Sequence, residues 1–109
     1  MTQLEDLMHA INEFREERNW NKSHNPKDLA ISISIEAAEL LEDFQWKSTE
    51  QAIEQNMENI KEEIADVLIY SLTLCSELNL DVEQIVREKI KKNGLKYPVK
   101  NSKQAERSR

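Results

Sequence analysis

The sequence has few of the residues that build turns, disulfides or membrane spans. One glycine and two prolines in 109 residues are too few for a chain of many short strands, which argues against a β-sandwich or a small barrel. The single cysteine cannot form an internal disulfide or a zinc cluster, so we expect a protein of the reducing cytoplasm. Apolar runs last only a few residues and the N-terminus carries no secretory signal, so we expect no membrane contact.

Positive charge is scarce outside the C-terminal end of the chain. Residues 95–109 hold five Lys or Arg and one Glu, whereas the first 94 residues hold ten basic and twenty acidic side chains. The body therefore repels nucleic-acid phosphates and attracts cations, which argues against nucleic-acid binding as the main function. We expect residues 1–98 to form the domain and residues 99–109 to form a basic, flexible, solvated tail.

Helical periodicity dominates the remaining pattern and predicts an all-α, four-helix bundle-like domain. The expected helices run from about Thr2 to Arg18, from Pro26 to about Phe44, from Ser48 or Thr49 to about Glu77, and from a capping box at Asp81 to Gly94. The third of them has room for a break. Residues 31–35 alternate like a strand, but the Asn25-Pro26 start signal and the helix formers that follow favour helix.

The second expected helix carries apolar residues on two faces. One face holds Leu29, Ile33, Ala37, Leu40 and Phe44, and the other holds Ile31, Ile35 and Ala38. A helix that is apolar on two faces needs two sets of partners, and a small domain of short helices offers few. We therefore expect a homodimer or homotetramer; the alternative is that the first and fourth helices cover both faces.

Two acidic pairs carry the most specific chemical signal. Glu36 and Glu39 lie three residues apart on the second helix, and Glu63 and Asp66 lie three apart on the third. Residues at this spacing share a helix face, and each pair has the same offset from its own apolar stripe. If the two helices pack antiparallel through these stripes, the four carboxylates converge at the seam.

Converging carboxylates need protonation or a cation. Two like charges about 4 Å apart repel by roughly 4 kcal/mol at an effective dielectric near 20. An all-oxygen ligand set favours Mg²⁺, then Mn²⁺ or Ca²⁺, whereas a di-iron bundle would need histidines where Glu42 and Ile69 stand. The alternative is that acidic residues are ordinary solvated side chains. We expect this of Glu42, Asp43, Glu58 and Glu62, although Asp43 and Glu62 lie close enough to assist the four predicted metal ligands.

Several single residues outside the acidic pairs have two interpretations. Trp20 and Trp46 lie near loop–helix junctions, where each could stack on a base or pack half-buried beneath a loop. His24 is expected to be a hydrogen-bonding loop residue rather than a catalyst, and His9 to lie at the surface. Cys75 falls on an apolar stripe as a small core residue.

At these residues the chain resembles the all-α, MazG-like nucleotide pyrophosphohydrolases, and among them the small dCTP pyrophosphatase-like branch. The matching segments are Phe14, Glu17–Trp20, His24, Pro26, Leu29, Glu36–Leu40, Phe44–Trp46, Glu62–Tyr70, Lys89, Asn93 and Lys96–Pro98. Paired acidic motifs combined with the FQW and KYP sequences are far more specific than either acidic pair alone. The chain departs from longer MazG proteins in having one copy of the domain.

The resemblance implies hydrolysis of a nucleoside triphosphate between the α and β phosphates, for nucleotide-pool cleaning, in dimers or dimers of dimers with sites built between subunits. Its implied Mg²⁺ ligands are Glu36, Glu39, Glu63 and Asp66. Its implied phosphate-holding residues are Lys89, Asn93 and Tyr97, and its implied base and sugar contacts are Trp20, His24 and Trp46. Glu39 and Glu63 are the expected catalytic carboxylates, together with Lys89 at the leaving phosphates; the choice of general base and of nucleobase stays open.

Two other functions fit the same pattern. A non-catalytic helical module would bind nucleotides or a partner helix without turnover. An enzyme for another polyphosphate, such as a phosphoribosyl-ATP pyrophosphohydrolase, would share the bundle; the tryptophans favour the nucleotide-pool branch.

Overall fold

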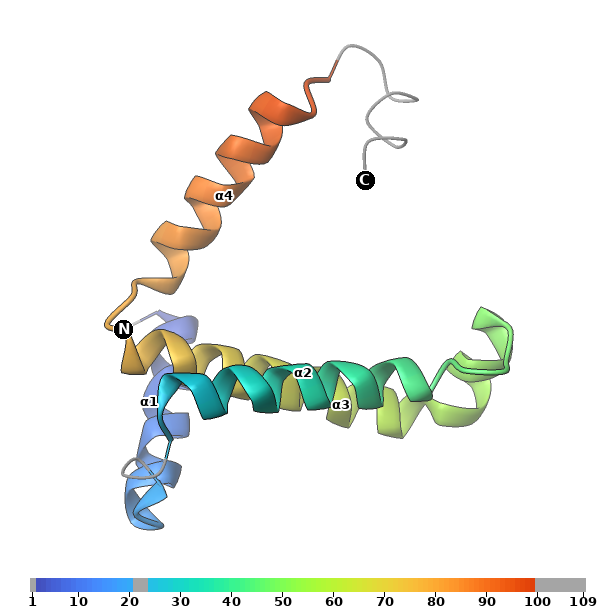
Figure 1. The fold of residues 1–109 in the computed structure, drawn as a ribbon, viewed down its shortest axis with the longest axis horizontal. Helices are drawn as coiled ribbons and strands as arrows, with labels where there is room; N and C mark the ends of the chain where they lie inside the picture. The colour runs from blue at the N-terminus through green and yellow to red at the C-terminus, as the bar shows by residue number, and fades with distance from the viewer. Residues whose placement is uncertain (1, 21–23, 100–109) are drawn as a thin grey trace. The chain divides into compact units, whose positions relative to one another are not determined.

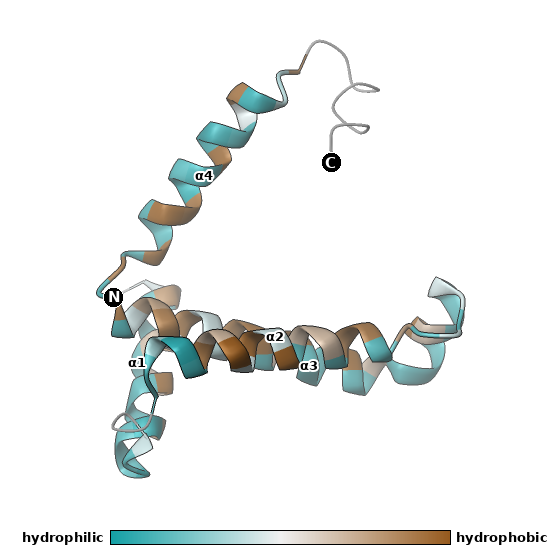
Figure 2. Cartoon of the chain, in the orientation of Figure 1, coloured by the Kyte–Doolittle hydropathy of each residue, from teal (hydrophilic) through white to brown (hydrophobic). Residues whose placement is uncertain are grey.

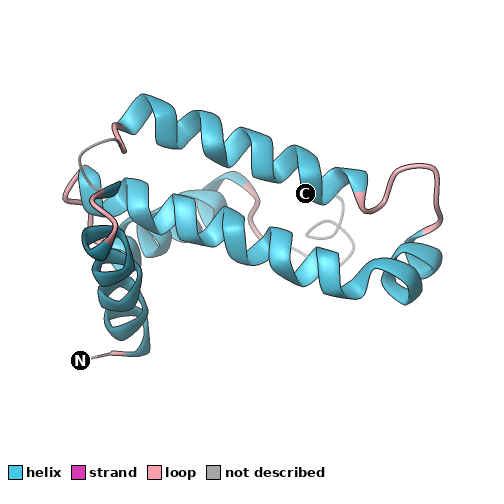
Figure 3. Ribbon diagram, turned by 90° about the horizontal axis from the view of Figure 1, so that it is seen from below, coloured by secondary structure: helices cyan, strands magenta, loops and turns pink. Residues whose placement is uncertain are grey.

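The computed structural model describes residues 2–20 and 24–99, and within them every regular element is a helix. The helices are α1 (Gln3–Glu17), α2 (Pro26–Glu42), α3 (Thr49–Glu77) and α4 (Val82–Lys96) (Figures 1 and 3). This confirms the expected all-α class and the four helices. None of the described helices is long and apolar enough to cross a membrane. The predicted tail, apart from Val99, lies outside the described residues.

Each helix begins at a side chain that accepts a hydrogen bond from an otherwise unpaired backbone N–H. These N-caps are Thr2, Asn25, Ser48 and Asp81. At α3 the cap is a complete capping box, because the Gln51 N–H donates to Ser48 Oγ and the Ser48 N–H donates to Gln51 Oε1. At α4 the expected box is only half formed, since the side chain of Gln84 donates instead to Glu88, at 3.0 Å.

The expectation that Gly94 ends α4 is wrong by two residues. Gly94 does not adopt a positive φ, and α4 continues through it to Lys96. The helix stops where Pro98 follows, because a residue before proline is pushed out of the α region. Tyr97 accordingly has φ −124° and ψ 69°.

The chain forms two compact units, residues 1–79 and residue 80 onward, which are described separately. In the first unit α2 and α3 lie side by side along their lengths, and hydrophobic residues follow both helices (Figures 1 and 2). Among the most buried side chains of this unit are Leu29, Ala52, Ile60, Leu72 and Thr73. Ile60, three residues before Glu63, is 7% exposed, so the apolar stripe of α3 to which it belongs faces the core.

A shorter contact joins α1 to the C-terminal part of α3. Asn12 Nδ2 donates to Ser76 Oγ at 3.3 Å, and the Arg15 guanidinium forms an ion pair with Glu77. Arg15 is only 6% exposed although it is charged, because it lies in line with the apolar residues of α1. These contacts hold the C-terminal part of α1 against the C-terminal end of α3.

The long helix α3 has a kink at Asn56, which confirms the expected break. Its φ of −120° and ψ of 19° are not helical. Asn56 Nδ2 donates to the backbone carbonyl of Asp43 at 2.7 Å, so the kink is tied to the C-cap residue of α2. The two helices are thereby held together next to their connection.

Candidate active site

Three carboxylates from α2 and α3 meet at the seam between these helices. Glu36, Glu39 and Glu63 each offer one oxygen, and these oxygens all lie within 4.8 Å of one another. The three side chains are half-buried. They meet because Glu36 and Glu39 are separated by about one turn of α2, while Glu63 lies on the neighbouring face of α3. We call these three residues the acidic triad.

Burial and mutual repulsion oppose ionisation of the triad. Burial raises the pKa of Glu36 to about 7, and the adjacent Glu39 and the charge of Asp66 add to this shift. Burial also raises the pKa of Glu63, with further contributions from the charges of Glu39 and Asp43. The physical cause is shared, since a carboxylate removed from water beside other carboxylates favours its neutral form.

The triad fits a hard divalent cation. All of its donor atoms are carboxylate oxygens, the ligand type that Mg²⁺ and Ca²⁺ prefer. One of them, Glu36 Oε2, is buried and has no hydrogen-bond partner among the described residues. A buried oxygen of this kind costs stability unless a proton or a cation reaches it.

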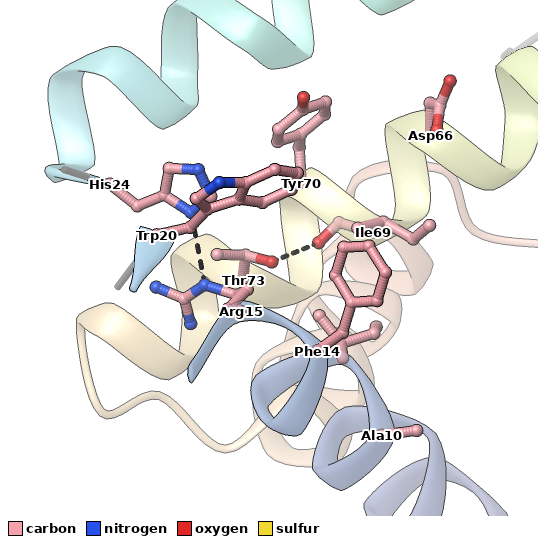
Figure 4. Close-up of a pocket in the computed structure, with 10 residues that line it drawn as sticks. Ala10, Phe14, Arg15, Trp20, His24, Asp66, Ile69, Tyr70 and Thr73 are labelled. Atoms are coloured by element: carbon pink, nitrogen blue, oxygen red, sulfur yellow. Dashed lines mark hydrogen bonds between the residues drawn. The ribbon is translucent and has the colours of Figure 1, made fainter. Parts of the chain in front are cut away.

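Asp66, the fourth predicted ligand, lies at the edge of this group. It is not part of the set within 4.8 Å, but its charge acts on Glu36. It also lines a cavity of about 400 Å³ in the first unit. The other lining residues are Ala10, Ile11, Phe14, Arg15, Trp20, His24, Ile69, Tyr70 and Thr73 (Figure 4). Asp66 therefore connects the triad with the cavity.

The cavity walls are mainly aromatic and aliphatic. The rings of Phe14 and Trp20 meet edge to face at 5.5 Å, and the rings of Trp20 and His24 lie 6.0 Å apart. Trp20 is 45% exposed, so part of its ring is accessible to a ligand. Tyr70 on α3 contributes a further ring (Figure 4). Apolar walls with a few polar groups are typical of small-molecule sites.

Arg15 is the cavity residue that sequence analysis missed. Its Nε donates to His24 Nδ1 at 3.2 Å (Figure 4). Its Nη1 donates to Asn12 Oδ1 at 2.9 Å. Burial, followed by the Arg15 charge, lowers the pKa of His24. The signal that could have found Arg15 is its spacing, four residues after Ile11 and seven after Met8, within the apolar stripe of α1.

The hydrogen bond to Arg15 confirms His24 as a loop hydrogen-bonder. Because Nδ1 accepts that bond, a neutral His24 carries its proton on Nε2. His9 is exposed, as expected, and Cys75 is partly buried on α3. For Trp46 the alternative of packing half-buried beneath a loop is wrong, since Trp46 is 95% exposed with φ 62°. Trp46 does not line the cavity.

Asp43 departs from its expectation as a solvated acid. It is 9% exposed, and its Oδ2 atom is buried without a hydrogen-bond partner among the described residues. Glu42, Glu58 and Glu62 are exposed, as expected. Asp43 is buried because it ends α2 where the kinked part of α3 packs against it, a contact that no local pattern predicts.

The predicted phosphate-holding residues belong to the second unit. Lys89 and Asn93 are exposed and four residues apart, so they share one face of α4, and Tyr97 caps its end. The Tyr97 N–H donates to the Asn93 carbonyl at 2.8 Å, and Lys96 Nζ lies 5.3 Å from the Tyr97 ring centre.

Comparison with known proteins identifies the family. The MazG-like family model matches residues 31–108. The chain belongs to the MazG-like family. Its match includes both acidic motifs, so the triad of this MazG-like protein lies wholly inside the matching region.

Relatives whose names state an activity extend the comparison. The MazG-like chain is 37% identical to dCTP pyrophosphatase 1 of Mus musculus over 101 residues and 34% identical to that of Homo sapiens over 100 residues. These alignments cover 88% and 87% of the chain but only 59% of each relative, so the chain spans well under two thirds of their length. A crystal structure of a pyrophosphatase from Archaeoglobus fulgidus is 46% identical with a TM-score of 0.84, covering 90% of this chain and 94% of that one.

Proposed function

We propose that this MazG-like protein is a Mg²⁺-dependent nucleoside triphosphate pyrophosphohydrolase, which converts a (d)NTP to the (d)NMP and pyrophosphate. The observation that carries the proposal is the acidic triad, with Asp66 connecting it to an aromatic cavity. A cavity of about 400 Å³ is within the usual range of small-ligand pockets, roughly 300–1,000 Å³. The pyrophosphatase names of the relatives support the same reaction class.

In this proposal Glu36, Glu39, Glu63 and Asp66 hold Mg²⁺, with Mn²⁺ as a substitute. A bound divalent ion supplies orientation of the phosphates, withdrawal of charge and a lower pKa for a bound water. The raised pKa of Glu36 and its unpartnered oxygen support a cation there, because a cation removes the repulsion among the carboxylates. The polyanionic substrate also needs this positive charge to approach the acidic seam.

Three kinds of side chain act on the substrate. Glu39 accepts the proton of the water that attacks the α-phosphorus. Glu63, as a ligand of the divalent ion, would keep the phosphates in place. Lys89 neutralises the charge that develops on the leaving pyrophosphate. Asn93, on the same face of α4 as Lys89, and Tyr97, at the end of α4, hold the phosphates.

The cavity would receive the base and sugar. Trp20 offers a ring for stacking, and His24 offers an Nε2–H donor, since its Nδ1 accepts from Arg15. The name of the curated relatives makes dCTP the first substrate to test, with other pyrimidine deoxynucleotides and modified bases beside it. A cytoplasmic location belongs to this proposal and rests on the single cysteine.

The proposal includes assembly of the chain into a homodimer or homotetramer. Its support is the second apolar face of α2, where Ile31 is 47% and Ile35 is 53% exposed. On α3, Ile64 and Leu68 are 44% and 54% exposed. Trp46, exposed at the α2–α3 connection, would contact a base in the site of the other copy.

A substrate screen tests the reaction. Each (d)NTP is incubated with the protein and Mg²⁺, and nucleotide products and pyrophosphate are separated by ion-exchange chromatography. The proposal predicts monophosphate and pyrophosphate in equal amounts, abolished by EDTA. Orthophosphate with a diphosphate contradicts it, and Mg²⁺-dependent nucleotide binding without turnover favours the non-catalytic module.

A pair of matched variants tests the residues. Glu63→Gln should lower kcat/KM at least 100-fold, equivalent to about 3 kcal/mol of barrier, with unchanged helical content by circular dichroism. Glu54→Gln makes the same charge change at an exposed position of α3 and should retain activity. Full turnover by Glu63→Gln would remove Glu63 from the site.

A further inference from the structure

Asp43 is a buried acid to which the proposed reaction gives no role. It is the C-cap residue of α2 and is 9% exposed. Its Oδ2 atom is buried and finds no hydrogen-bond partner among the described residues. The hydrogen bond that Asn56 donates to this residue goes to the backbone carbonyl, so it does not satisfy Oδ2.

The position of Asp43 is electrostatically unfavourable for a charge that stands alone. The C-terminal end of a helix carries a partial negative charge, so an acid there is repelled by α2 itself. Burial without a partner adds a desolvation cost to the ionised form. A positive charge near the carboxylate would offset both effects.

The geometry connects Asp43 with the acidic triad. Asp43 follows Glu39 by four residues and Glu36 by seven, so all three lie on the face of α2 that packs against α3. The contact of Asn56 with Asp43 places this end of the face against α3. The charge of Asp43 acts on Glu63 and contributes to the raised pKa of that residue.

We propose that Asp43 is a further cation-holding residue, which extends the acidic triad along the α2–α3 seam and strengthens its hold on a hydrated divalent cation. The proposal rests on the metal site of the proposed function. It separates Asp43 from the neighbouring Glu42, which has the same charge but is exposed. Groups that orient or support metal ligands commonly contribute about 10–100-fold to metal affinity.

Binding of Mn²⁺ to the nucleotide-free protein tests this inference. Mn²⁺ is titrated into wild type, Asp43→Asn and Glu42→Gln, and the free ion is followed by electron paramagnetic resonance. We expect Asp43→Asn to weaken binding about 10-fold or more, and Glu42→Gln to change it less than about threefold, since an exposed charge is screened by water and salt. Equal affinities of the two variants would overturn the inference.

Thermal unfolding separates cation holding from a structural role. Without metal, Asp43→Asn should unfold at a higher temperature than wild type, because a buried unpaired charge is removed. The rise in Tm on adding MgCl₂ should be smaller than in wild type. A variant that is less stable or unfolded without metal, or that keeps the full MgCl₂ effect, contradicts the inference.

Glu63→Gln distinguishes failure of this inference from failure of the proposed function. If wild type binds Mn²⁺, and Glu63→Gln loses that binding while Asp43→Asn keeps it, only the proposed role of Asp43 is contradicted. If wild type binds no Mn²⁺, both the proposed metal site and the proposed role of Asp43 are contradicted.

Discussion

At the scale of single residues, Glu36 shows most clearly how burial opposes ionisation. It shares the seam with two other carboxylates and keeps one oxygen buried without a partner. Its folded-state pKa of about 7 lies above the ordinary value of 4.5. Between these two values the folded protein binds more protons than the unfolded chain, so stability from this group falls as pH rises.

The first prediction follows from this decrease of stability with rising pH. Without metal, the free energy of unfolding of wild type should fall between about pH 4.5 and pH 7 relative to that of Glu36→Gln. Above pH 7 Glu36→Gln should be more stable by ~1–2 kcal/mol, allowing for screening of a partly exposed group. Urea unfolding at a series of pH values measures both. Parallel pH profiles of the two proteins would remove Glu36 as the source of the effect.

Arg15 carries the second prediction at this scale. Its side chain is 7% exposed and that of its partner Glu77 is 28% exposed. Arg15→Met therefore leaves the largely buried Glu77 carboxylate without its ion-pair partner and removes the hydrogen bond to His24. Because water still reaches Glu77, we expect a loss of ~2–3 kcal/mol, below the usual 3–5 kcal/mol for breaking a buried pair. Chemical denaturation of Arg15→Met and of the double variant Arg15→Met/Glu77→Gln measures it. The double variant should recover part of the loss; a cost of Arg15→Met under about 0.5 kcal/mol, typical of a surface change, contradicts this account.

At the scale of secondary-structure elements, α4 offers a direct contrast between two interpretations of one residue. Gly94 lies inside the helix without positive φ, and a Cβ added there would meet no atom within 4 Å. Gly94→Ala should therefore stabilise α4 by about 0.5–1 kcal/mol, because alanine loses less backbone entropy. Helical content and Tm from circular dichroism test this. Destabilisation would restore Gly94 as a helix end.

How far the sequence predicts the elements depends on where the deciding contacts lie. Helix starts were predictable, because Asn25, Ser48 and Asp81 act on residues only three positions away. The acidic triad was predictable from spacing once α2 and α3 were paired. Burial of Asp43 was not, since it depends on the kink at Asn56, thirteen residues along the chain.

At the scale of the whole molecule, the exposed apolar face of α2 and α3 matters most. We expect Ile35→Glu to shift the protein from a dimer or tetramer toward monomers, because it places a charge in the proposed interface. Size-exclusion chromatography with light scattering measures the mass. Gln55→Glu adds the same charge at an exposed position of α3 and should leave the assembly unchanged. A wild-type protein that is monomeric at all concentrations contradicts the proposed oligomer.

The most direct test of the central claim is a crystal soaked with Mn²⁺ and measured for anomalous scattering. We expect a peak at the α2–α3 seam with oxygens of Glu36, Glu39 and Glu63 at about 2.0–2.6 Å, the range spanned by Mg²⁺ and Ca²⁺. An anomalous map with no peak there, and with the three side chains turned apart into solvent in every copy, would contradict it.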